Sequence, residues 1–180
     1  MKTKKNKYSA VISNQKGYSM VEMVIVIAII AVLSAVSFTT VSAIYTAKAN
    51  SAGNTLDSQM AYLASMTKAQ DASLAMLLYY DTSDGTYYMQ QGKVDDTGAF
   101  TADTTKDKVA LSNSIGLFYK AAGSTSESLV DDTGEIIRFS KSDGSVMDGA
   151  GTYRITKRGA SGKTVLSVVL NKNTGSHYTK

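Results

Sequence analysis

The chain has 180 residues, no cysteine and no proline, and its formal charge is +4 at pH 7. This length holds one globular domain with an extension, and the lack of cysteine excludes disulfides and thiolate metal sites. Five lysines lie in residues 1–17 without any acid, so the rest of the chain carries 14 basic and 15 acidic side chains. The basic isoelectric point therefore does not indicate a nucleic-acid-binding protein.

An apolar stretch follows the basic residues 1–17. Eleven unbroken apolar residues run from Met23 to Leu33, and after Glu22 the next charge is Lys48. Such a run is typical of a segment buried in lipid or in a bundle of helices. The lysines before it favour a cytoplasmic N-terminal side. A single carboxylate at the edge of an apolar segment is costly, so Glu22 is predicted to be functional.

Residues 16–38 resemble the N-terminus of the type IV pilin family, which includes the pseudopilins of type II secretion and competence systems. The family pattern is a basic leader that ends in Gly, a first mature residue that is usually Phe, Glu at the fifth mature position, and an apolar helix. Here Gly17, Tyr18 and Glu22 fill these positions. The chain departs from the pattern at two helix positions, Ala31 and Thr39, and it lacks the cysteine pair of many Gram-negative pilins.

The resemblance implies a structural pilus subunit rather than an enzyme, with no catalytic residue, metal or cofactor. A prepilin peptidase would cut after Gly17 and methylate the amine of Tyr18. An assembly ATPase and its membrane platform would then join identical subunits into a filament, with Glu22 acting in assembly. The precursor would lie in the cytoplasmic membrane, in contact with lipid, and the filament on the cell surface. Adhesion, motility and DNA uptake follow from the family only.

One long helix is predicted from residue 18 to about residue 80. Its first half is apolar, and Ala28, Ala31 and Ala35 share one face there, which allows close helix packing. Tyr18 and Glu22 are four residues apart and are expected on one helix face. Without a proline at Thr39, the helix is expected to be continuous from about Ser19 to at least Ala47.

The second half of this helix is predicted to be amphipathic. Its apolar face recurs at spacings of three and four residues, at Leu56, Met60, Leu63, Thr67, Gln70, Leu74 and Leu77. Residues 50–54 combine Gly with Asn, which weakens the helix and favours a kink. The turn at residues 81–85 is expected to end the helix.

Strands are predicted after residue 135, while residues 86–128 give a mixed signal. The strands are expected at 136–140, 152–156 and 164–170, with turns at 142–144 and 160–162. The predicted fold is α+β, with the long helix packed on a small antiparallel sheet of three or four strands. Three regions are expected: a leader at 1–17, an apolar half-helix at 18–47 and a globular domain at 48–180.

Other motifs have simpler explanations. The sequence Val-Asp-Asp-Thr-Gly occurs at 94–98 and 130–134, which is compatible with an aspartic protease pair or with calcium binding. Each triplet follows another Asp, however, and this favours a solvated turn. His177 is the only histidine, so a metal site or a Ser-His-Asp triad is not indicated there.

The charge is unevenly distributed after the expected leader. Residues 18–148 carry 8 basic and 15 acidic groups, whereas residues 149–180 carry six basic groups and no acid. Three interpretations stay open: a solvated sheet face, head-to-tail complementarity between subunits, and a tract that binds nucleic acid.

Three alternatives to a pilus subunit stay open as well. One is a pseudopilin of a secretion or competence machine. Another is a secreted binding domain behind an ordinary signal peptide, cut near Val41-Ser42-Ala43, although Glu22 is unfavourable at the start of such a signal. The third is an enzyme anchored by one membrane helix.

Overall fold

The computed structural model describes residues 18–157 and 159–180. Gly17 and the expected leader lie outside the described residues. The chain divides into two compact units between Val41 and Ser42. The helix α1 (Met20–Ala69, 50 residues) begins in the first unit and continues into the second, which contains all the described strands.

Local signals account for the start and the continuity of α1. Ser19 precedes the helix, and its Oγ accepts a hydrogen bond from the backbone N of Val21 at 3.3 Å, as an N-cap residue does. The helix continues through Thr39, so the prediction of a continuous helix to Ala47 is confirmed. It also continues through residues 50–54. Gly53 lies against the sheet there, and a Cβ added to it would collide with the side chain of Leu166.

The helix ends at Ala69 and not near residue 80, so this part of the prediction is wrong. Oδ1 of Asp71 accepts hydrogen bonds from the backbone N and the hydroxyl of Ser73, both at 2.9 Å. Such a local bond competes with helical hydrogen bonds and favours a turn. Leu74 and Leu77 therefore lie in a strand, β1 (Leu74–Asp81). Leu74 and Leu77 continue the helical spacing of the preceding stripe, and a short apolar run of this kind is also compatible with a strand, which explains the error.

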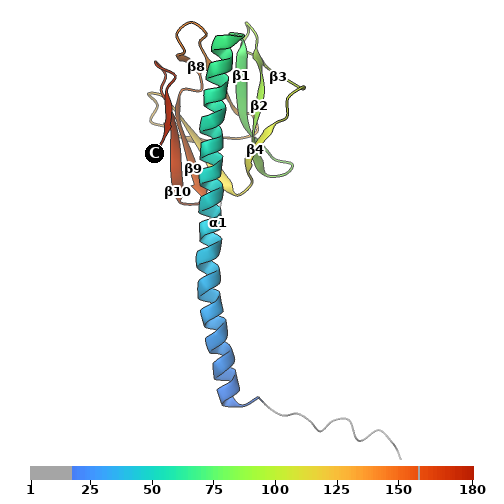
Figure 1. Ribbon diagram of the computed structural model, residues 1–180, viewed down its shortest axis with the longest axis vertical. Helices are drawn as coiled ribbons and strands as arrows, with labels where there is room; N and C mark the ends of the chain where they lie inside the picture. The colour runs from blue at the N-terminus through green and yellow to red at the C-terminus, as the bar shows by residue number, and fades with distance from the viewer. Residues whose placement is uncertain (1–17, 158) are drawn as a thin grey trace, which may run out of the picture. The chain divides into compact units, whose positions relative to one another are not determined.

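The strands form two antiparallel sheets (Figure 1). The first sheet has the order β3 (Phe100–Ala102), β2 (Thr86–Val94), β1, β7 (Glu135–Phe139) and β8 (Val146–Asp148), with β4 (Val109–Ser112) also paired to β2. The second sheet has the order β11 (His177–Thr179), β10 (Thr164–Leu170), β9 (Gly151–Lys157), β5 (Ile115–Ala121) and β6 (Ser128–Leu129).

The α+β class is confirmed, but the sheets have more strands than predicted. Most of the additional strands come from residues 86–129, where short strands and frequent turns gave a mixed signal. The turns predicted at 142–144 and 160–162 connect β7 to β8 and β9 to β10. The turn at 81–85 connects β1 to β2 instead of ending the helix.

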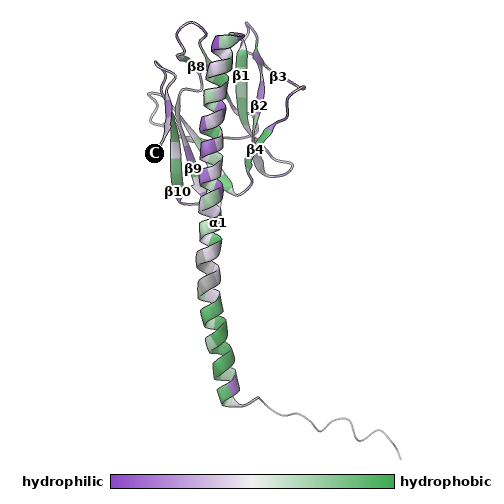
Figure 2. Ribbon diagram, in the orientation of Figure 1, coloured by the Kyte–Doolittle hydropathy of each residue, from purple (hydrophilic) through white to green (hydrophobic). Residues whose placement is uncertain are grey.

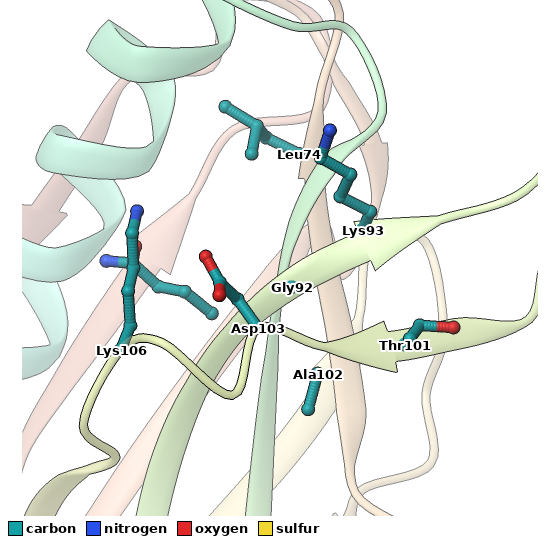
Figure 3. A pocket seen from close by; sticks show the side chains of 8 residues that line it. Leu74, Gly92, Lys93, Thr101, Ala102, Asp103 and Lys106 are labelled. Carbon is teal, nitrogen blue, oxygen red and sulfur yellow. The ribbon is translucent and has the colours of Figure 1, made fainter.

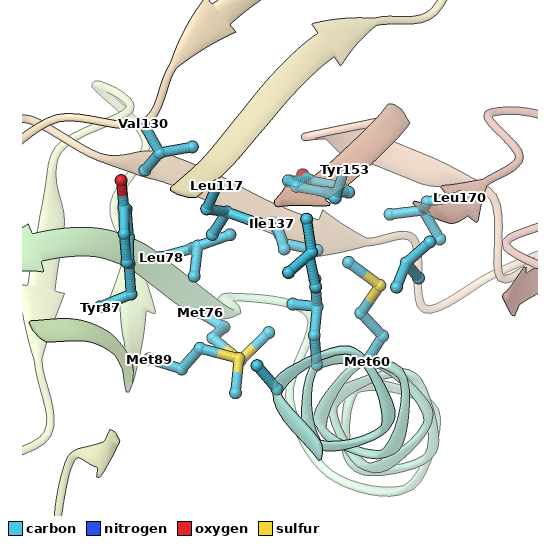
Figure 4. Packing of buried hydrophobic residues seen from close by; sticks show 14 of the residues in the cluster. Met60, Met76, Leu78, Tyr87, Met89, Leu117, Val130, Ile137, Tyr153 and Leu170 are labelled. Atoms are coloured by element: carbon cyan, nitrogen blue, oxygen red, sulfur yellow. The ribbon is translucent and has the colours of Figure 1, made fainter. Parts of the chain in front are cut away.

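The core lies between the second part of α1 and both sheets (Figure 4). From the helix it takes one stripe, which confirms the amphipathic pattern as far as Thr67: Ala49, Ala52, Leu56, Met60, Leu63 and Thr67 are buried. Met76, Leu78 and Ile137 point into it from the first sheet, and Leu117 and Tyr153 from the second. One helix stripe thus covers apolar side chains of two sheets.

Candidate functional site

The first part of α1 exposes its apolar side chains on all faces. Figure 2 shows the hydrophobic colour on this part of the helix. Val26 is the least exposed of the large apolar side chains between Met20 and Leu33, and it still exposes 45% of its surface. Among the described residues, α1 is the one helix long and apolar enough to cross a membrane. A contiguous apolar surface of this kind marks a site of contact with a membrane or with another protein.

Two serine hydroxyls of this segment are satisfied by the helix itself. Ser34 donates to the carbonyl of Ile30 at 2.7 Å, and Ser37 donates to that of Leu33 at 2.8 Å. A polar side chain can therefore lie in an apolar environment without leaving a donor unpaired. The sequence prediction missed these two serines. Their signal in the sequence is a serine placed four residues after an apolar residue of the helix.

Two sets of small residues lie on different faces of this segment. Ser34 and Ser37 lie in a shallow groove whose other lining residues are Ile30, Leu33 and Val41. The predicted small-residue face of Ala28, Ala31 and Ala35 is exposed. At about 100° per residue, this alanine face points well away from the groove.

Glu22 lies in the first turn of α1. The free backbone N–H groups and the helix dipole favour a negative charge at this end. Ser19 and Glu22 also have the spacing of a capping box, Ser-x-x-Glu. Tyr18 precedes the cap and is not helical. The expectation that Tyr18 and Glu22 share one helix face is therefore wrong, because Ser19 starts the helix after Tyr18.

The cleavage site of the signal-peptide alternative lies inside α1. Residues 41–43 are helical, and Ser42 Oγ accepts a hydrogen bond from Nζ of Lys157 in β9 at 3.1 Å.

A pocket of about 360 Å³ lies beside β2 and β3 (Figure 3). Its two lysines already have partners: Lys93 contacts Asp71 at 2.8 Å, and Lys106 donates to Gln91 Oε1 at 2.7 Å. Both lysine side chains are thus held by neighbouring polar groups.

Both Val-Asp-Asp-Thr-Gly copies form exposed turns. Asp95 Oδ1 accepts hydrogen bonds from Thr97, and Asp131 Oδ1 accepts them from Thr133, in each case from the backbone and the hydroxyl. These bonds hold the pKa of both carboxyls below the ordinary value. The sequence analysis favoured solvated turns over an aspartic protease pair at these two positions, and the structure has turns there.

No metal site is found among residues 18–157 and 159–180, where no group of three or more metal-ligating side chains gathers. His177, at the start of β11, has its Nε2 3.9 Å from Oδ1 of Asp57 in α1. It has no second ligand of its own kind, because it is the only histidine and the chain has no cysteine.

Arg154 is one of the cations that gave residues 149–180 their positive charge. Its Nε and Nη2 donate to the two carboxylate oxygens of Glu127 at 2.9 and 2.6 Å, and its guanidinium lies 4.1 Å from the ring centre of Phe118. This ion pair lowers the pKa of Glu127 and raises that of Arg154. Arg154 therefore adds little free positive charge for nucleic acid.

The comparisons with known proteins bear on the start of the chain. Residues 12–38 match the family model described as the prokaryotic N-terminal methylation motif. Neither the comparison with curated proteins nor that with solved structures found a match for the chain. The matched residues contain the acidic residue and most of the exposed apolar segment described above. The chain therefore carries the hallmark motif of type IV prepilin-like proteins, the class that includes pilins and pseudopilins.

Proposed function

We propose that this chain is the structural subunit of a type IV pilus. It is stored in the cytoplasmic membrane as a precursor, cleaved after Gly17 by a prepilin peptidase, methylated on the amine of Tyr18, and assembled with identical copies into a surface filament. One observation carries the proposal: the methylation motif opens a helix whose apolar side chains are exposed on all faces. Lipid before assembly, and neighbouring helices after it, supply the missing partner.

In this proposal, Glu22 guides assembly through its charge. A carboxylate in the apolar zone of a bilayer costs on the order of 2.5–3.5 kcal/mol. Cleavage after Gly17 creates an α-amine on Tyr18, and such an amine is mostly protonated at neutral pH. The amine of an incoming subunit meets Glu22 of a subunit already in place. An unpaired charge is strongly disfavoured inside an apolar core, so this pair sets the register of each new subunit.

Substitutions at Glu22 test the assembly step. Glu22→Val is expected to be cleaved and to stay in the membrane, but to assemble poorly, and Glu22→Asp is expected to assemble weakly. Sheared filament is compared with the membrane pool by immunoblot, and Ser34→Ala, in the same segment, serves as the control. Filament yield at the wild-type level from Glu22→Val would contradict the assembly role.

The mature N-terminus tests the processing step. Mass spectrometry is expected to find a methylated Tyr18 as the first residue, whereas an ordinary signal peptide would leave a residue near Ile44. Gly17→Val is expected to leave the full-length precursor in the membrane. Gly17 has no side chain and lets the backbone bend in the protease site, whereas valine would obstruct it. A product of normal size from this variant would refute cleavage after Gly17.

The pseudopilin alternative is separated by electron microscopy. Long shed filaments in which peptides of this chain are identified support the pilus subunit. Processed subunits that form no long filaments favour a pseudopilin of a secretion or competence machine.

A further inference from the structure

A lysine of the second sheet reaches α1 just after the apolar segment. Lys157, the last residue of β9, donates from Nζ to Ser42 Oγ at 3.1 Å and to Thr46 Oγ1 at 3.3 Å. The Thr46 hydroxyl itself donates to the carbonyl of Ser42 at 3.0 Å. An ammonium group has three N–H donors. The contacts with Ser42 and Thr46 use two of these donors, which leaves one for a further acceptor.

The positive charge at this contact has no carboxylate beside it. Lys157 is half-buried, and no ion pair joins it to an acid within the described residues. Lys48, two residues after Thr46 in α1, donates to Ser114 Oγ at 3.4 Å. Neither residues 23–56 nor residues 149–180 contain an acid. A half-buried cation whose neighbours are neutral hydroxyls keeps its charge available to an external anion.

The position of this contact along α1 indicates which anion is available. Residues 23–41 carry no charge, and these 19 residues span about 28 Å of helix at about 1.5 Å per residue, close to the hydrocarbon core of a bilayer. Ser42 follows this segment directly, and Tyr45 and Lys48 come within the next two turns. Tyrosine is typical of the interface of a spanning helix, and a lysine near its end reaches toward the headgroups.

We propose that Lys157, with Ser42 and Lys48, binds the phosphate of an anionic phospholipid headgroup while the precursor is held in the membrane. This rests on the proposed function, since it requires α1 to span the bilayer. The phosphate accepts a charge-assisted hydrogen bond from Lys157 and a second bond from Ser42. The headgroup thereby holds the sheet unit at the membrane surface, and extraction into a filament releases it.

The test uses the full chain reconstituted into vesicles of phosphatidylcholine alone, or of equal amounts of phosphatidylcholine and phosphatidylglycerol. The acylation rate of each lysine by an amine-reactive ester is followed by mass spectrometry. Lys157 is expected to react about fivefold more slowly in the anionic vesicles, from the usual attraction of one lysine to an anionic surface. Lys172, an exposed lysine in the turn after β10, is expected to react at the same rate in both.

Two charge-matched variants sharpen the test. Lys48, as part of the proposed site, is also expected to react more slowly in the anionic vesicles. Lys157→Glu is expected to remove this protection of Lys48, whereas Lys172→Glu is expected to keep it. Circular dichroism checks that both variants are folded. Inorganic phosphate, added to the chain in detergent, is expected to leave the acylation of Lys157 unchanged, because the contact needs a headgroup held beside the helix.

A separate label distinguishes the failure of this inference from the failure of the proposed function. The chain has no cysteine, so Ile27→Cys provides a single thiol for a fluorophore that reports bilayer depth. A label at residue 27 in water overturns the membrane-spanning helix and with it the proposed function. A label in the bilayer, with Lys157 acylated equally in both lipids, overturns the headgroup site alone. If the protection of Lys157 rises with protein density in either lipid, a second copy of the chain is its partner. This result also overturns the headgroup site.

Discussion

The two parts of α1 have the same secondary structure but opposite surroundings. From Met20 to Leu33 the large apolar side chains are exposed on every face, whereas from Ser42 to Ala69 one stripe is buried against two sheets. Leu33 exposes 61% of its surface and Leu56 none. An α-helix thus forms in both parts, but among the described residues only side chains of the second part lie in the core with those of the sheets. The first part therefore contributes little to the folding stability of the chain.

The largest expected effect comes from separating the two parts. Residues 42–180, expressed without the apolar segment, are expected to be soluble, folded and monomeric, because the buried stripe and the Lys157 contact with Ser42 are kept. Sedimentation and circular dichroism provide the measurement. An unfolded or aggregated fragment would show that the apolar segment belongs to the core of the subunit.

A matched pair of leucines measures the difference directly. Leu56→Ala is expected to lower the free energy of unfolding by about 2–5 kcal/mol, because it leaves a cavity in the core. Leu33→Ala, the same substitution on an exposed position, is expected to stay within about 0.5 kcal/mol. Denaturation of the full chain in mild detergent measures both. Equal losses would mean that the apolar segment also packs within the subunit.

Thr67 offers a gain of stability in the buried stripe. Its side chain is fully buried, and its Oγ1 has no hydrogen-bond partner among the described residues. Thr67→Val removes this unpaired hydroxyl with little change of shape and is expected to add about 1 kcal/mol to the free energy of unfolding. Thr46→Val is the control, since Thr46 has hydrogen bonds to lose. A loss of stability at residue 67 would show that its hydroxyl has a partner.

The smallest expected effect concerns the exposed Asp turns of the sheet unit. Hydrogen bonds from Ser83 and the nearby Lys108 lower the pKa of Asp81 from 3.8 to about 2. The charged form is favoured in the folded state, so this stabilisation is complete above about pH 4 and is lost as the pH falls through about 2.

Asp81→Asn keeps the acceptor for Ser83 but cannot titrate. It is therefore expected to flatten the fall in melting temperature between about pH 5 and pH 2. Ser83→Ala removes the donor and is expected to flatten it as well. A wild-type slope in both variants would show that Asp81 does not couple folding to pH.

Local patterns were sufficient to predict the parts of the chain whose structure depends on near neighbours. The uncharged run after Glu22 predicted an apolar helix, and the spacing from Leu56 to Thr67 predicted its buried stripe. The resemblance at residues 16–38 was matched by the methylation motif at 12–38. Side chains on one helix face lie within a few residues of each other in the sequence, so their pattern is visible without the fold.

Only the tertiary structure decided where the helix ends and how many strands cover it. The run from Leu74 to Leu77 continues the helical spacing, but its side chains lie in β1, between β2 and β7. Gly53 looked like a weak point of the helix, yet it lies where Leu166 approaches. The contact of Lys157 with Ser42 joins residues 115 positions apart. Such long-range contacts outweigh local propensity by burying apolar surface and pairing polar groups, and no local pattern records them.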